Sequence, residues 1–437
     1  SYWGPIPTES DTTKQVYEAQ GLALWAYPLK VPYYAVVTPT GLFFDGVGAG
    51  VNALQESGVI YQLSQLFGPR QGPFGLLVNF QAGGLDGIGG GLTGVHDEFF
   101  GADNRFKIRF FGSTNQTIKT HFGAIIPQGK NTWDFGAGYR VRPTARYFGI
   151  GPDTKEEDEE GNGRESHYTQ ETTWAGVTLA RSLTDDLSAS ARVMFTASGA
   201  RGPHEDEADE AIDRVYPEVL NDPNFGYRDR SDGVGFGLRL MHDTTLEDGR
   251  PESGNVYRVA ADYFTSVDES KLGYWTYRAE AQQFLPLWFS SRSLALRAVM
   301  AKIEVTDGDI PFQRLYTNDE PDLFRGYKDF RWRDLGLTSL TAEYRWPIWA
   351  NTPRGLGLDA NLFVEVGQVF DEFESLALRD MATSIGGGIR LIGANGFLGR
   401  FEVATSDEET VFRIKADQIF QYDRSSFYHG RNPIPIR

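Results

Sequence analysis

The chain has 437 residues, a formal net charge of −17, 50 glycines, 14% aromatic residues and no cysteine. The lack of cysteine excludes a disulfide scaffold, a thiolate zinc site and a cysteine nucleophile. The acidic balance argues against nucleic acid as a partner, because phosphate contacts need a basic surface. No apolar run reaches the roughly 18 residues of a transmembrane helix. A mean hydropathy of −0.38 is nevertheless typical of a barrel whose lipid-facing and lumen-facing residues alternate.

Residues 1–72 follow no strand pattern. Residues 22–44 are apolar but contain three prolines, and residues 51–67 have the apolar stripe of one helix, which Gly68-Pro69 would end. We expect this region to be a periplasmic extension or a plug inside a barrel lumen, and the sequence favours neither.

From residue 73 onward the apolar residues alternate with polar ones at a period of two, which predicts β-strands. The stretches 105–110, 187–199, 275–282, 358–367 and 412–420 all show it. In residues 133–142, one face carries Trp133, Phe135, Ala137, Tyr139 and Val141, and the other carries Asp134, Gly136, Gly138, Arg140 and Arg142.

A soluble β-sandwich also alternates, but three features favour a membrane barrel. The segments are longer than the roughly 5–6 residues of a globular strand and close to the roughly 9–11 residues that cross a bilayer at a tilt. Aromatic residues gather near segment ends, and short turns (182–187 and 347–356) alternate with a long acidic connection (200–232). We therefore predict an all-β fold, an antiparallel transmembrane barrel of about sixteen strands over residues 73–420. The expected strands begin near Phe74, Leu85, Arg105, Thr117, Trp133, Tyr168, Leu187, Val234, Asn255, Tyr274, Leu294, Leu337, Leu358, Ser384, Phe397 and Val411.

The chain end has its own pattern. Phe420 is the expected terminal aromatic of the last strand, and residues 421–437 are a tail in which Pro433 and Pro435 prevent further pairing.

Three short motifs between residues 320 and 350 resemble a known family. They are Leu-Phe-Arg-Gly-Tyr (323–327), Phe-Arg-Trp-Arg-Asp (330–334) and Glu-Tyr-Arg-Trp-Pro-Ile (343–348). They resemble the outer-membrane protein assembly factors of the BamA/TamA superfamily, also called bacterial surface antigens. Residues 147–152, 363–370, 384–390 and 399–404 are similar to that family too, so the resemblance covers about residues 73–420.

The resemblance implies a sixteen-stranded barrel in the bacterial outer membrane, with the sixth loop folded into the lumen. In that loop the motif is Arg325, Gly326 and Tyr327, which our strand count places between the eleventh and twelfth strands. The family usually carries periplasmic POTRA domains, and residues 1–72 have too few helices and too many prolines to form one. The chain thus resembles a member without POTRA domains.

Arg325 is expected to form a latch with Glu343 and Glu365. Alternation places both acids on the lumen face of neighbouring strands, and a charge held in a narrow lumen needs a partner. The planar guanidinium suits carboxylates, and Gly326 allows a tight turn beside it. The resemblance implies the same latch, whereas the alternative is an exposed arginine with no fixed contact.

No enzymatic site is readable. The six histidines lack metal-ligand spacing, no Gly-x-Ser-x-Gly elbow occurs, and Gly87–Gly91 lacks the lysine of a phosphate loop. The acidic runs Glu156–Glu160 and Glu205–Glu210 fit solvated loops better than cation sites that bridge to lipopolysaccharide. We expect no enzyme activity, no metal and no cofactor.

The resemblance implies a role in outer-membrane assembly, or in protein or lipid transport across that membrane. The missing POTRA domains and the polar lumen support an alternative, a passive pore or a structural scaffold subunit of an outer-membrane complex. The expected partners are outer-membrane lipid and lipopolysaccharide, with protein partners in such a complex.

Overall fold

The computed structural model describes residues 73–415, with short gaps at 83–84, 100, 102–103, 155–163, 223, 246–250, 269–270, 288–291, 319–322, 352–355, 378, 380 and 394–395. The expected extension or plug (1–72), Phe420 and the tail (421–437) lie outside the described residues. No helix among the described residues is long and apolar enough to cross a membrane.

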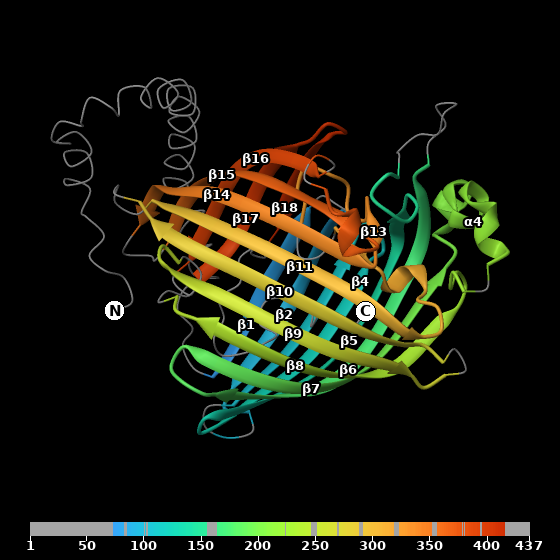
Figure 1. Ribbon diagram of the computed structural model, residues 1–437. Coiled ribbons are helices and arrows are strands. Elements are labelled where there is room, and N and C mark those ends of the chain that lie inside the picture. The colour runs from blue at the N-terminus through green and yellow to red at the C-terminus, as the bar shows by residue number, and fades with distance from the viewer. Residues whose placement is uncertain are drawn as a thin grey trace.

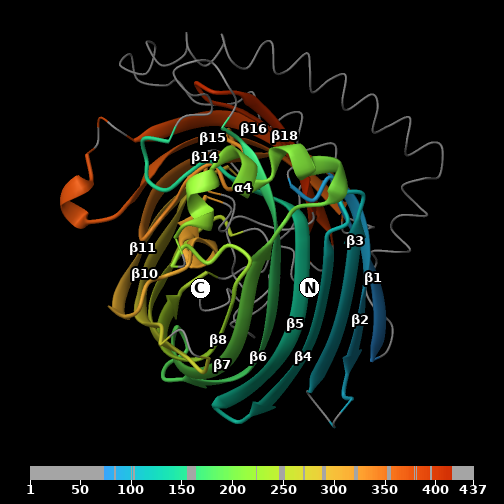
Figure 2. The same cartoon turned by 90° about the vertical axis from the view of Figure 1, so that its right-hand side faces the viewer.

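Sixteen antiparallel strands form one sheet that curves around a common axis (Figures 1 and 2), which confirms the predicted all-β antiparallel fold and its strand number. Every strand begins within four residues of its predicted start. The strands are β1 (Phe74–Ala82), β2 (Ile88–Asp97), β3 (Arg105–Ser113), β4 (Ile118–Gln128), β5 (Asn131–Tyr147), β6 (Ser166–Ser182), β7 (Leu187–Arg201), β8 (Arg230–Asp243), β9 (Gly254–Ser266), β10 (Gly273–Pro286), β11 (Ser293–Asp307), β14 (Gly336–Asn351), β15 (Leu356–Phe370), β16 (Ala382–Gly393), β17 (Gly396–Thr405) and β18 (Thr410–Lys415).

Each strand pairs with the next one along the chain, and β11 pairs directly with β14. The first and last strands, β1 and β18, are neighbours in the sheet order, and Ala82 and Ile414 form a register pair between them in the described part of the chain. On its other side, β18 pairs with β17 from Arg400–Lys415 to Thr405–Thr410. We call the line between β1 and β18 the seam, because it joins the two ends of the sheet.

The two faces of the sheet differ as the alternation predicts. On β14 and β15, Leu340 and Leu362 are 47% and 38% exposed, whereas Glu343 and Glu365 are buried. Strand geometry sends successive side chains to opposite faces, so the apolar set points outward and the polar set points inward. An apolar outer band is what a bilayer requires of a barrel.

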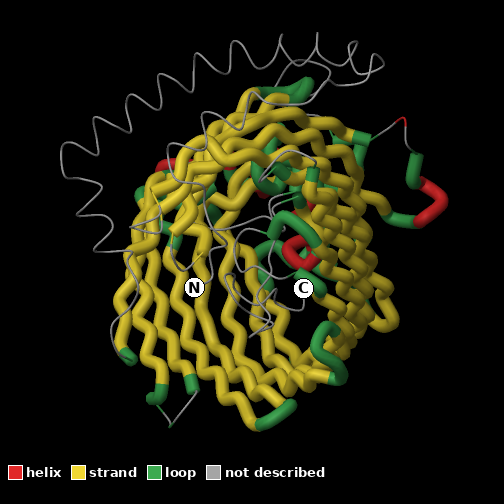
Figure 3. Tube along the Cα trace, turned by 90° about the vertical axis from the view of Figure 1, so that its left-hand side faces the viewer, coloured by secondary structure: helices red, strands yellow, loops and turns green. Residues whose placement is uncertain are grey.

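Figure 3 shows the zigzag of the strands around the barrel and the loops at its rims. The connection between β7 and β8 contains η2 (Glu205–Glu210), α4 (Ile212–Val215) and η3 (Pro217–Leu220), and β15 is followed by η6 (Phe373–Ser375). The turn predicted at residues 347–356 is shorter, because β14 continues to Asn351 and β15 starts at Leu356. Pro347 has no N–H for the ladder, and a shift in register after Pro347 lets the strand continue past it.

The connection between β11 and β14 is built unlike the other loops. It contains η4 (Phe312–Arg314) and a two-stranded ribbon of β12 (Tyr316–Thr317) and β13 (Arg333–Asp334). Within residues 323–334, which we call the connecting segment, every residue except Lys328 is buried. The aromatic residues of the segment join one core cluster with strand residues such as Val299 and Leu337. Such burial is unusual for a loop, so the segment packs as part of the barrel core.

Candidate functional site: the Arg325 cluster

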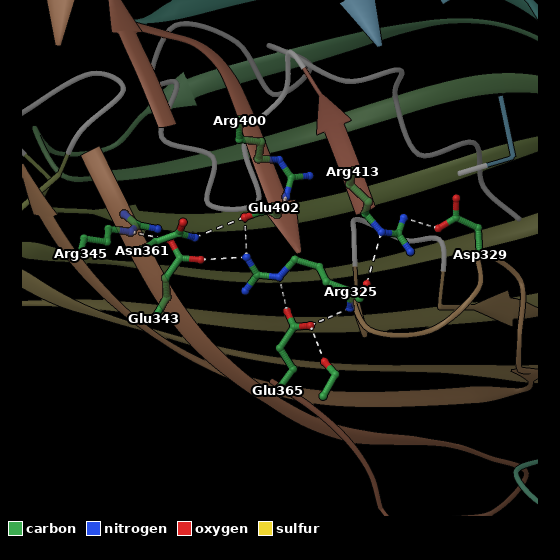
Figure 4. Close-up of polar contacts among 10 residues, drawn as sticks. Arg325, Asp329, Glu343, Arg345, Asn361, Glu365, Arg400, Glu402 and Arg413 are labelled. Atoms are coloured by element: carbon green, nitrogen blue, oxygen red, sulfur yellow. Dashed lines mark hydrogen bonds and ion pairs between the residues drawn. The ribbon is translucent and has the colours of Figure 1, made fainter. Parts of the chain in front are cut away.

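Arg325 lies in the connecting segment and is fully buried among three carboxylates (Figure 4). Its backbone N–H and its Nε donate to the two oxygens of Glu365 at 2.7 and 2.8 Å. Its Nη1 donates to Glu343 at 3.0 Å and to Glu402 at 2.8 Å. Both carboxylates that the sequence analysis paired with Arg325 are thus within ion-pair distance, and Glu402 is a third.

The three acids come from β14, β15 and β17, and each has a further polar partner. Arg345 Nε donates to Glu343 at 2.7 Å, and Ser384 Oγ donates to Glu365 at 3.1 Å. Arg400 donates to Glu402. The carboxylates are therefore shared between Arg325 and the strand residues, and this offsets part of the cost of burying charge.

Glu402 was not among the partners predicted for Arg325. Its inward direction could be read from the sequence, because Arg400, Glu402 and Ala404 alternate with Phe401 and Val403 as on the other strands. Its closeness to Arg325 could not, because β17 is two strands beyond β15 in the sheet order. Only the curvature of the sheet brings β17 to Arg325.

Gly326 is required for close approach and not for an unusual backbone angle. A Cβ at this position would lie 2.7 Å from Ser384 Cβ and 2.8 Å from the carbonyl oxygen of Thr405. Gly326 is absent from the described residues with positive φ. It lies in the expected tight turn, in which the N–H of Tyr327 donates to the carbonyl of Phe324 at 3.0 Å. Two bulky neighbours do have positive φ, Phe324 at 62° and Phe330 at 66°. Such angles are uncommon for aromatic residues, and the surrounding packing maintains them.

Tyr327 and Arg413 attach the connecting segment to the last three strands. The hydroxyl oxygen of Tyr327 lies 2.6 Å from a carboxylate oxygen of Asp407 and 3.1 Å from the carbonyl oxygen of Thr383, so its one proton can be donated to either. Arg413, on β18, donates to the carbonyl of Tyr327 at 2.8 Å and forms an ion pair with Asp329. The segment is therefore held by named contacts on β16, β18 and the turn between β17 and β18.

Asp329 also reaches the other side of the seam. Its second carboxylate oxygen accepts a hydrogen bond from the backbone N–H of Leu85, in the turn between β1 and β2, at 3.3 Å. One side chain of the connecting segment thus contacts both β18, through Arg413, and the turn that follows β1. Its position depends on how these two edges sit relative to each other.

Arg331 and Arg333 anchor the rest of the segment. Arg331 donates to both carboxylate oxygens of Glu408 and to Thr154. The guanidinium of Arg333 lies within 5.0–5.7 Å of four aromatic ring centroids, those of Tyr147, Tyr168, Phe312 and Phe330. Cation–π contacts of this kind each stabilise by about 0.5–2 kcal/mol.

The remaining candidates of the sequence are the histidines and the two acidic runs. No group of three or more potential metal ligands occurs among the described residues. His204 contacts Gln116 at 2.9 Å, and in the acidic run 205–210 Asp209 pairs with Arg214 and Glu210 with His167. The run 156–160 lies outside the described residues. The Arg325 cluster can bind and hold a loop, through the backbone N–H, Nε and Nη1 of Arg325.

Comparison with known proteins agrees with this architecture. A family model described as the Omp85 superfamily domain matches residues 98–418. The fold is similar to that of BamA from Haemophilus ducreyi lacking POTRA domains 1–3, at 12% identity and a TM-score of 0.56, over 79% of this chain and 70% of that one. It is also similar to CdiB from Escherichia coli, at 11% identity and a TM-score of 0.52, over 80% of this chain and 63% of that one.

The chain thus spans less than two thirds of the length of that CdiB chain. At identities of 11–12%, these structural similarities establish the fold alone. No curated protein matches the sequence significantly.

Proposed function

The chain belongs to the Omp85 superfamily and is an integral outer-membrane β-barrel protein, and on that premise we propose that it acts in outer-membrane assembly or in moving protein or lipid across that membrane. We also propose that its sheet closes at the seam in the membrane, with the connecting segment inside the lumen. Protein partners, outer-membrane lipid and lipopolysaccharide remain the partners we expect. Enzyme activity is not part of the proposal.

The seam is the observation that carries this function. It is the line where the first and last strands meet, and Asp329 of the connecting segment contacts both sides of it, through Leu85 and Arg413. Strand edges that lose their partner are templates for another strand. A seam that opens would expose such edges to a client chain, and Asp329, in contact with both sides, would couple that opening to the connecting segment.

The alternative is a passive pore or a scaffold subunit, and the polar inner face supports it. A passive pore does not need its seam to open, whereas the proposed assembly or transport function does. A covalently locked seam should therefore abolish the proposed function and leave a pore unaffected. The absence of cysteine from the chain allows the seam to be locked without interference from native thiols.

The test introduces cysteines at the register pair Ala82 and Ile414, in the full chain reconstituted in liposomes. A matched control pair, Val364→Cys with Ile385→Cys, joins β15 to β16 at another register pair. The measurement is the rate at which an unfolded outer-membrane β-barrel protein inserts, followed by its heat-modifiable mobility on gels. We expect the unmodified chain to accelerate this insertion. Oxidation of the seam pair should abolish the acceleration, and a reductant should restore it. Oxidation of the control pair should have no effect.

Two results would contradict the proposal. Equal insertion rates with the seam oxidised and reduced would show that seam opening is not used. A chain that never accelerates insertion but conducts ions steadily across a planar bilayer would support the pore instead.

A further inference from the structure

The inner face of β3, β4 and β5 carries an excess of positive charge that the chain as a whole does not have. The chain has a net charge of −17. The described residues of these three strands nevertheless include a single acidic residue, Asp134. The basic residues of the three strands are Arg105, Lys107, Arg109, Lys119, Arg140, Arg142 and Arg146.

Nearby acids neutralise the ends of this surface. Asp97 pairs with Arg105 at 2.7 Å, and Asp86 contacts Lys119 and, at 3.1 Å, Arg142. Beyond the register shift that follows Arg142, Arg146 pairs with Glu165 at 2.6 Å. Between these ends the inner face carries Lys107, Arg109 and Arg140, which we call the basic wall.

Lys107 is the distinctive member of the basic wall. It makes no ion pair and no hydrogen bond with any residue in the described part of the chain. Arg105 and Arg109 act on it as like charges and Asp134 as an opposite one. Its register partners are Val95 and Gly123, so no polar side chain lies directly beside it on β2 or β4. A lysine kept on an inner face without a direct ion pair is a cost that a bound anion would offset.

The basic wall is also open, unlike the opposite side of the barrel. Lys107, Arg109 and Arg140 are all partly exposed. The inward arginines of β14, β16, β17 and β18 (Arg345, Arg390, Arg400 and Arg413) are each at most 5% exposed. Near these strands the connecting segment fills the interior, so a ligand that reaches the lumen meets the basic wall and not the Arg325 cluster.

The three cations stand close enough to share one ligand. Lys107 and Arg109 are alternate residues of β3 and point to the same face. Arg109 pairs with His121 of β4, and His121 pairs with Gly138 of β5. Arg140 is two residues beyond Gly138 and shares its face. Neighbouring strands are about 4.8 Å apart and alternate residues of one strand about 6.8 Å apart. Long, flexible side chains can therefore converge on one group. Lys and Arg lining a pore favour anions and phosphates, and guanidinium forks match phosphate oxygens.

We propose that the basic wall binds a multiply charged oxyanion of the phosphate class, with Lys107, Arg109 and Arg140 as its donors. The inference goes beyond the proposed function, since it concerns neither the seam nor the connecting segment. The phosphate could be free or carried on a lipid headgroup, and the two sources share the same recognition.

Titration calorimetry of the full chain in a nonionic detergent would test it, with inorganic tripolyphosphate as the probe and dihexanoyl phosphatidic acid as the lipid arm. We expect saturable binding that weakens as NaCl is raised, because screening acts on exposed charges. Lys107→Gln and Lys107→Glu should each weaken it about tenfold or more, and Lys107→Arg should preserve it. Arg181→Gln, which removes one exposed charge at the end of β6, is the matched control and should leave binding unchanged.

Binding of tripolyphosphate alone would assign the site to free phosphates, and binding of the lipid as well would extend it to headgroups. No saturable binding of either probe would overturn the proposal. If Arg181→Gln weakened phosphate binding as much as Lys107→Gln does, the proposal would also be overturned. The affinity would then depend on the net charge of the chain and not on the basic wall. The insertion assay of the seam is a separate measurement, so either proposal can fail while the other stands.

Discussion

Phe363 lies directly against the guanidinium of Arg325, whose Cζ is 3.2 Å from the centroid of the Phe363 ring. Phe363 and Glu365 are alternate residues of β15 and share its inner face. One strand therefore supplies both a carboxylate in the plane of the guanidinium and an aromatic surface against it. This combination fixes the orientation of Arg325 as well as its charge.

Replacing Arg325 with alanine should destabilise the barrel strongly. Glu343, Glu365 and Glu402 would be left buried with one cation fewer, and removing one partner of a buried pair typically costs about 3–5 kcal/mol. Arg325→Lys should recover only part of this, since an ammonium cannot form the same fork or lie flat on a ring. The free energy of unfolding in urea, followed by tryptophan fluorescence, would measure both. A loss under about 1 kcal/mol for Arg325→Ala would show that the three contacts do not stabilise the fold.

The strands and the inward direction of Glu343 and Glu365 were predictable, because a period of two over long segments determines both strand and face. The resemblance identified Arg325 as their partner. Phe363 and Glu402 were not predicted. Phe363 alternates with Leu362 and Val364 and so falls on the inner face, but an apolar residue there gives no indication of a cation above it. Glu402 reaches Arg325 only because the sheet curves, and periodicity within a strand contains no information on curvature.

Gly326→Ala should destabilise by about 1–3 kcal/mol, the usual cost of an overpacked core. The new methyl group would meet Ser384 Cβ and the carbonyl of Thr405 at under 3 Å, and a backbone atom cannot move aside. Gly94→Ala on β2 is the matched control, since nothing lies within 4 Å of its added Cβ. Thermal unfolding of both variants would compare them, and an equal effect at the two positions would contradict the steric account.

Asp329 and Arg413 should show a large coupling energy in a double-mutant cycle. Their side chains are buried, and contacting residues in one network couple by about 0.5–3 kcal/mol. The cycle would use Asp329→Asn and Arg413→Gln with urea unfolding of single and double variants. The pair Asp97 with Arg105, at 2.7 Å but with side chains 28% and 44% exposed, is the control and should couple by about 0–1 kcal/mol. Equal coupling in the two pairs would mean that the contact beside the seam is no stronger than a surface ion pair.

The stability of the connecting segment should fall as pH rises from about 4 to 7. Asp334 lies in β13, outside the membrane-spanning strands. Burial of its carboxyl group, together with the negative charge of Asp371, raises its pKa to about 6. The hydrogen bond from the backbone N–H of Leu335 and the positive charge of Lys302 oppose this shift. The folded state therefore holds a proton that the unfolded chain has already released. The resulting stability is fully present below the ordinary value of 3.8 and is lost as pH rises through about 6. A shift of this size corresponds to at most about 3 kcal/mol.

Protease cleavage within residues 323–334 would report the opening of the segment, because most of it is buried when folded. We expect cleavage to accelerate between pH 4 and 7 in the unmodified chain, after correction for the protease's own pH profile. Asp334→Asn cannot ionise and should show a flat dependence over the same range, with its resistance close to that of the unmodified chain at low pH. If the asparagine variant retains the full slope, another titrating group controls the segment and Asp334 does not.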